Sequence, residues 1–345
     1  MAKKQHMTWP KHLCCAFAIC AAVTSNARGH AGVEHVPNSD AVDDSGSQGL
    51  VVTGPRNWQE LARAWEFDPL VVLPLLLSGY WYSLGLLRLW RSAGRGGGIR
   101  RWEAAAFGGG WLALVVALIS PLHRWGGMLF SAHMTQHEVL MLVVAPLLVL
   151  GKPLIGILKG LPAGWARDLV HWTSARWWRY VWHAITNPFA AWLIHAVILW
   201  AWHIPLLFEA TLSNDFAHAL QHLSFLLSAL LFWWAVMQGP RRALNFGIAV
   251  VYMFTTALHS GALGALITFS NTVWYPAYRE TAPFWGLSAL EDQQLGGLVM
   301  WIPACTLYII AGLALVVGSM RASDERVRRW EKSPTAAASI RNVPT

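Results

Sequence analysis

The 345-residue sequence is short of charged residues. Only 13% of its residues are charged, against about 25% in a typical soluble protein, and 55% are hydrophobic. Cysteine is also scarce: Cys14, Cys15, Cys20 and Cys305 form no CxxC pair and no readable disulfide framework. A thiolate metal site in the mature chain is therefore not expected. The sequence also has no HExxH motif of the kind that metalloproteases use.

Long apolar runs take the place of the missing charge. Seven runs come near the ~20 residues that a helix needs to cross about 30 Å of hydrocarbon. Because backbone groups in lipid must bond within their own segment, we expect an all-α, polytopic membrane protein. The expected spans are residues 69–90, 103–122, 134–151, 189–208, 216–238, 246–269 and 294–318. Pro146 in the third span predicts a kink or a partial crossing.

The segments around the spans have their own composition. Residues 1–27 have a basic start, a short apolar core and a small-residue cleavage site, as a signal peptide does, with an uncleaved anchor helix as the alternative. Residues 28–66 are polar and predict an exported flexible segment. Residues 67–320 would then form the seven-helix membrane domain, and residues 321–345 a basic cytoplasmic tail.

Lys and Arg are concentrated in alternate loops, namely those after the first, third and fifth spans, and in the tail. By the positive-inside rule, the N-terminus is expected outside and the C-terminus inside. This topology accounts for the net charge of +8, and no nucleic-acid partner is expected.

Histidines gather at the outer ends of three predicted spans. Residues four apart share a helix face, and imidazole suits Cu, Zn, Fe and Ni. We therefore expect a bound metal or haem, with a water-filled polar vestibule as the alternative. The expected ligands are His133, His137, His203, His218 and His222. Met134, one position off the His133 face, is a further candidate ligand that would suit Cu(I).

Other polar residues are expected to support these histidines. Gln136, Asp215 and Gln221 can hold the second imidazole nitrogen and fix its tautomer. Asp292 and Gln293 can either cap the seventh helix or bond the ligating histidines. We interpret His123 as an ordinary interfacial histidine. His195 and His259 lie deeper, where they can bond neighbouring helices, ligate or pass a proton.

Three segments resemble the CtaG family of polytopic, caa-type cytochrome c oxidase assembly factors, over about residues 65–320. They are "HMTQHEVLMLVVAPLLVLGKP", "WHIPLLFEATLSNDFAHALQHLSFLLSALLFWW" and "LEDQQLGGLVMWIP". One departure is Leu147, where the family often has a second proline after Pro146. The resemblance implies a seven-helix protein needed to form active oxidase, with copper delivery as its usual proposed role. It carries that role onto the five histidines named above, together with Asp292 and Gln293.

We therefore expect an assembly factor, not an enzyme, in the bacterial cytoplasmic membrane. It would bind copper as Cu(I) on the outer side and pass it to cytochrome c oxidase subunits. Three alternatives remain open: haem b held by paired histidines, a metal-free docking scaffold for oxidase subunits, and a zinc hydrolase with Glu138 or Asp292 as base. Because only unprotonated imidazole ligates, metal occupancy is expected to fall below a pH of about 6.5.

Overall fold

The computed structural model describes residues 57–238 and 246–331, and these residues form helices without any strand. Six helices are long and apolar enough to cross a membrane. They are α3 (Pro69–Ala93), α4 (Arg101–Ile119), the segment Phe130–Leu150, α13 (Asp215–Met237), α14 (Phe246–Thr268) and α15 (Ala289–Glu331). A seventh crossing exists if α10 (Arg176–Ile185) and α11 (Pro188–Trp202), bent by 69°, count as one span. The expected all-α, multi-pass membrane protein is confirmed, and its orientation stays a prediction.

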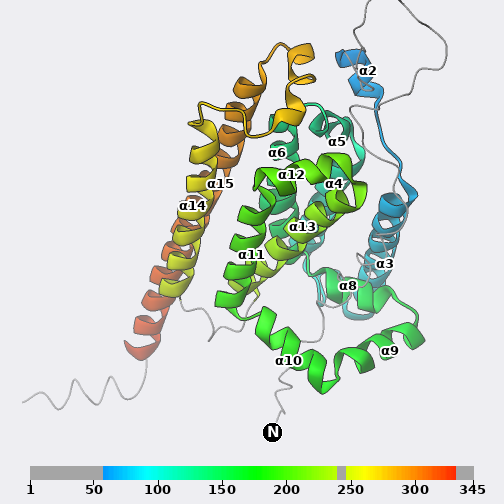
Figure 1. Cartoon of the computed structure of the whole chain (residues 1–345). Helices are drawn as coiled ribbons and strands as arrows, with labels where there is room; N and C mark the ends of the chain where they lie inside the picture. The colour runs from blue at the N-terminus through cyan, green and yellow to red at the C-terminus, as the bar shows by residue number, and fades with distance from the viewer. Residues whose placement is uncertain (1–56, 239–245, 332–345) are drawn as a thin grey trace, which may run out of the picture.

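Short helices lie at both ends of the bundle (Figure 1). One end carries α2 (Trp58–Arg63) and α5 (Pro121–Gly126), and the opposite end carries α8 (Pro153–Gly160), α9 (Ala163–Thr173) and α10. The remaining short elements are α12 (Pro205–Ser213) and the 3₁₀ turns η4 (Pro276–Tyr278) and η5 (Ala282–Trp285). The expected signal sequence (1–27) lies outside the described residues, as do residues 28–56 of the exported segment and 332–345 of the tail.

Two of the spans form the centre of the bundle. In Phe130–Leu150, 61% of the most apolar stretch is buried within the protein, and in α13 the share is 67%. The other four long helices bury between 17% and 44%, which leaves most of their apolar surface for lipid. The two central helices also carry the paired histidines, so these histidines lie on the most buried spans of the bundle.

The third span is continuous but not a regular α-helix. It consists of α6 (Phe130–Glu138), the π-helical segment η3 (Val139–Val144) and α7 (Ala145–Leu150). Pro146 has no N–H and would crowd the preceding turn, and a π turn is one of the ways in which helices absorb such a break. The Trp233 indole of α13 donates to the Met141 carbonyl at 2.9 Å, which gives this irregular segment a partner across the bundle.

The fourth and seventh spans end at other places than expected. α11 stops at Trp202 instead of 208, because Ile204 takes the extended conformation favoured before a proline and Pro205 begins α12. The break leaves His203 directly after the last residue of α11. Helix α15 continues to Glu331, so it includes the first part of the segment expected as a tail.

Helix α15 packs very closely on α6. A Cβ built on Gly296 would lie 2.3 Å from Cδ1 of Phe130 and 3.3 Å from Cγ of Met134, so only glycine fits at this crossing. This close approach fixes the start of α6, and with it the first histidine pair, against the seventh helix.

Candidate metal centre

Six imidazole rings lie together at one end of the bundle, and we call them the histidine cluster. Its members are His123, His133, His137, His203, His218 and His222. Two come from the first turns of α6 and two from the first turns of α13, one follows α11, and His123 lies in α5. The structure thus brings together all five histidines that the sequence singles out.

The rings are in close contact both within and between helices. Ring centroids are 4.4 Å apart in the His133–His137 pair and 4.3 Å apart in the His218–His222 pair. Across the two central helices, the centroid of His222 is 5.2 Å from that of His137 and 5.9 Å from that of His133. His203 is more distant, at 6.4 Å from His137. The five predicted histidines are each at most 7% exposed.

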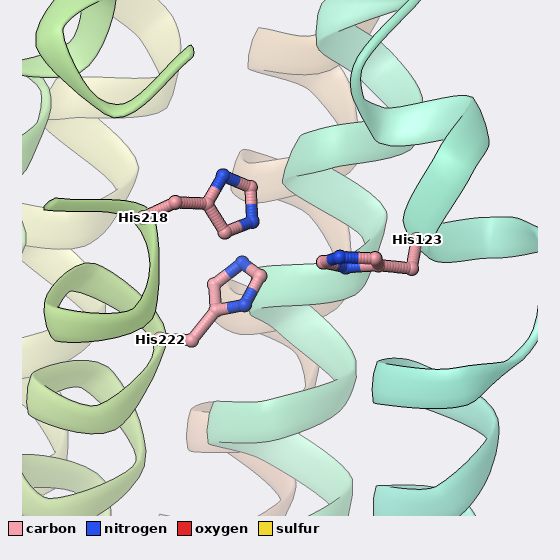
Figure 2. A group of neighbouring side chains, drawn as sticks. All are labelled: His123, His218 and His222. Atoms are coloured by element: carbon pink, nitrogen blue, oxygen red, sulfur yellow. The ribbon is translucent and has the colours of Figure 1, made fainter. Parts of the chain in front are cut away.

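Two overlapping groups of three histidines have the spacing of a metal site. We call the first the His123 trio (His123, His218 and His222, Figure 2) and the second the His133 trio (His133, His137 and His222). In each trio the candidate nitrogens lie within 4.8 Å of one another. Three nitrogens bound to one ion at about 2.0 Å lie roughly 3.3–3.5 Å apart, so small ring rotations would complete either site. His222 belongs to both.

Several ring nitrogens of the His133 trio make no hydrogen bond of good geometry with the described residues, although His133 lies near the Gly126 backbone and His137 near the Gln221 side chain. These nitrogens are Nδ1 of His133, both nitrogens of His137 and Nε2 of His222. A buried polar atom without a partner costs about 1–3 kcal/mol, and such atoms usually mark a missing water, ion or ligand. The donor set therefore fits an imidazole-binding metal ion.

His123 is the member of the cluster that sequence reasoning missed, because a single histidine at a helix end reads as interfacial. Its centroid lies 5.3 Å from that of His218. Its one sequence signal is position: it follows the second span on the side where the other histidines lie.

The nitrogens of His123 are already engaged. The Gln136 amide donates to the Ala117 carbonyl at 2.7 Å, which fixes the orientation of the amide, and it also donates to His123 Nδ1 at 2.9 Å. His123 Nε2 faces the Glu66 carboxylate at 3.7 Å. The His133 trio is therefore the more available of the two, and Gln136 holds His123 instead of one of the expected ligands.

The other supporting residues fall into different roles. Gln221 Oε1 lies 3.2 Å from His133 Nε2, in the position expected for a residue that fixes a tautomer. Gln293 instead holds the loop before α15, since it accepts from Trp274 N–H at 2.6 Å and donates to the Thr272 carbonyl at 3.1 Å. Asp215 is half-buried at the start of α13, and its expected role stays a prediction.

Asp292 neither caps its own helix nor bonds a histidine. Its carboxylate accepts from the backbone N–H groups of Phe130, at 2.6 Å, and Ser131, at 3.1 Å, and from the Ser131 hydroxyl at 2.6 Å. It therefore caps α6 from α15. Glu291 accepts from the N–H and the hydroxyl of Ser288, at 2.8 and 2.7 Å, and so fills the capping role at the start of α15.

His203 and Met134 face each other at the edge of the cluster. His203 Nδ1 lies 2.6 Å from the Leu199 carbonyl, and its Nε2 lies 3.4 Å from Met134 Sδ. Burial lowers the pKa of His203 to about 4, against a smaller opposing effect of the hydrogen bond to Leu199. Both side chains are enclosed, with Met134 0% and His203 4% exposed.

The two deeper histidines are separate from the cluster. His195 Nδ1 lies 3.1 Å from the Ser228 hydroxyl of α13, which is the interhelical bond considered for it. His259 of α14 is half-buried, with its ring edge-on to Trp192. Phe208 and Phe225, both 0% exposed, pack on His133 and His137 and close the cluster with apolar walls.

Comparison with known proteins gives a family match over most of the chain. Residues 80–322 match the family described as "Cytochrome c oxidase caa3 assembly factor (Caa3_CtaG)". The chain is 27% identical over 288 residues to an uncharacterized protein of Mycobacterium leprae (strain TN), covering 81% of this chain and 43% of that protein. Uncharacterized proteins of Mycobacterium bovis and Mycobacterium tuberculosis are 26% identical over 291 residues, again with 43% of their length covered. The chain thus spans less than half the length of these relatives. No solved structure matches it.

Proposed function

Because this chain belongs to the cytochrome c oxidase caa3 assembly factor family, we propose that it binds copper at the histidine cluster and passes it to an assembling oxidase. The metal is cargo in this proposal, and the oxidase subunits are the partners that receive it. The proposed location is the bacterial cytoplasmic membrane, with the cluster at the outer face. The Lys- and Arg-rich loops at the opposite end of the bundle support that orientation.

The observation that carries the proposal is the set of buried, unpartnered nitrogens in the His133 trio. Among the described residues, four ring nitrogens of three histidines lack a hydrogen bond, and the three rings meet from two different helices. Packing alone gives no reason to place three polar rings against one another in an apolar enclosure. A metal ion bonded to one nitrogen of each ring would reduce that cost.

The contacts between the rings favour an ion over haem. Two axial histidines must lie on opposite faces of a macrocycle, whereas neighbouring rings of the cluster touch edge to face at 4.3–5.3 Å. The engagement of Asp292 argues against one of the two carboxylates considered as a base for hydrolysis, because it is taken up by the start of α6; Glu138 is the other.

The test is the copper content of the purified full-length protein in detergent, before and after His137→Ala and His222→Ala. We expect wild-type protein to retain copper through desalting and both variants to lose most of it. The loss should be larger for His222→Ala, because His222 belongs to both trios. His171→Ala is the matched control, since His171 is an exposed histidine in α9, outside the cluster.

Two results would contradict the proposal. Unchanged copper in both cluster variants would show that these rings do not hold it. A Soret band in the absorption spectrum of the purified protein would favour the haem alternative.

A further inference from the structure

We propose that Met134 Sδ and His203 Nε2 form a nitrogen–sulfur ligand pair beside the His133 trio, and that this pair makes the cluster selective for Cu(I) over Zn(II). The inference rests on the proposed function, because it names the oxidation state of the metal cargo. It stands on a contact between two atoms that are both acceptors.

The first step is the tautomer of His203. A carbonyl oxygen can only accept, so the 2.6 Å contact with Leu199 places the proton of a neutral His203 ring on Nδ1. Nε2 then carries the lone pair, and it lies 3.4 Å from Met134 Sδ. A thioether sulfur has no proton to donate. Two buried atoms that each carry a lone pair therefore face each other, with no hydrogen atom between them.

The second step is geometry. Protein metal sites place nitrogen about 2.0 Å and thiolate sulfur about 2.3 Å from the metal. An ion at those distances would bridge two atoms 3.4 Å apart at an N–metal–S angle of roughly 105°, close to tetrahedral. The separation of the two atoms is compatible with this angle, and a rotation of the ring would aim the Nε2 lone pair at the ion. The pair is thus already set at the separation that one bound ion requires.

The third step is continuity with the rest of the cluster. Met134 lies between His133 and His137 on α6, and the rings of His137 and His203 are 6.4 Å apart. An ion held by the His133 trio is therefore one ligand exchange away from the pair. Core packing explains why Met134 is buried next to Gly296, but it does not require the sulfur to face an imidazole nitrogen.

The fourth step is ligand preference. Thioether sulfur is a soft ligand that selects Cu(I), whereas imidazole alone suits Zn, Cu, Fe and Ni without separating them. An all-histidine cluster would accept Zn(II) as well as copper. The sulfur supplies the discrimination that the six histidines lack.

The experiment compares Cu(I) and Zn(II) binding by full-length protein in detergent, with and without Met134→Leu. Cu(I) affinity is measured by competition with a chromophoric chelator under reducing conditions. We expect Met134→Leu to weaken Cu(I) binding by about tenfold or more, as loss of a ligand should at least match the loss of a supporting residue. Zn(II) affinity should change less than twofold. X-ray absorption of the Cu(I)-loaded wild type should show a sulfur shell that Met134→Leu lacks.

Met141→Leu is the matched control, because Met141 is a buried methionine of the same span whose side chain is not in the cluster. It should leave the affinity for both metals and the sulfur shell unchanged. Copper bound through nitrogen alone, with equal affinity in Met134→Leu, would overturn this inference and leave the proposed function standing. Absence of copper binding by the wild type would overturn both.

Discussion

The cap that Asp292 provides for α6 leads to a quantitative prediction. The first N–H groups of a helix have no partner within it, and here α15 supplies the acceptor for two of them. Asp292→Ala would leave the N–H groups of Phe130 and Ser131 buried without an acceptor, while the Ser131 hydroxyl can rotate to another one. His133 follows two residues later, so fraying at this end displaces a proposed ligand.

The magnitude follows from the contacts that are lost. Each buried N–H without a partner costs about 1–3 kcal/mol, and loss of a helix N-cap costs about 0.5–2 kcal/mol. Both figures describe the same orphaned donors, so they are not added, and the two N–H groups together suggest a destabilisation of roughly 2–6 kcal/mol. Asp292→Asn keeps one acceptor oxygen for one of the two N–H groups, so it should cost less than the alanine variant.

Thermal unfolding in detergent, followed by intrinsic tryptophan fluorescence, measures the effect, and a copper titration of the same samples measures the effect on the cluster. Glu291→Ala is the matched control, because Glu291 is the adjacent, exposed carboxylate that caps only its own helix. We expect Asp292→Ala to lower both the unfolding temperature and the copper affinity, and Glu291→Ala to leave the copper affinity unchanged. Equal effects of the two variants would refute the idea that α15 fixes the start of α6.

Two further predictions concern packing and pH. Gly296→Ala puts a Cβ 2.3 Å from Phe130, so it should destabilise the protein by about 1–3 kcal/mol in the same unfolding assay. Gly108→Ala is the control, because nothing lies within 4 Å of its Cβ, and it should not destabilise the protein. A harmless Gly296→Ala would contradict the close approach of α15 to α6. The second prediction follows from the lowered pKa of His203, because the folded state disfavours the protonated ring. The free energy of unfolding of metal-free protein should therefore fall by up to roughly 3 kcal/mol as the pH falls from 6.5 to about 4. The dependence of this free energy on pH should be weaker in His203→Gln. A pH profile identical in that variant would show that His203 does not contribute.

The spans and the five histidines were predictable because each has a strong local signal. Long apolar runs identify the helices, and the i,i+4 spacing of His133 with His137 and of His218 with His222 places each pair on one face. That these faces meet is a tertiary result, but the shared end of the spans made it a reasonable expectation. His203 depended on the same argument, although the helix that carries it ends earlier than its hydropathy indicates, because of Pro205.

The interactions that support the site were not predictable from local pattern. Asp292 bonds groups more than 160 residues away in the chain, and a first-turn acidic residue reads as a cap for its own helix. Gln136 shares a helix with the expected ligands, yet it faces α4 and α5 and holds His123. For both Asp292 and Gln136, the sequence predicted correctly that the residue lies on a helix near the site. The partner of each side chain depends on which neighbouring helix packs against that side of its own helix.

The shared histidine argues for transit of a metal over permanent storage. A resident metal keeps a closed set of ligands whose other nitrogens are held by supporting partners. Here His222 belongs to two trios, so an ion bound by one trio leaves the other with only two histidines. In the His123 trio the two nitrogens of His123 are engaged by Gln136 and Glu66, while the His133 trio has unpartnered nitrogens and adjoins a thioether. If the cargo is Cu(I), the unpartnered nitrogens of the His133 trio and the soft sulfur of Met134 favour its movement from His123 towards Met134 by exchange of one ligand at a time.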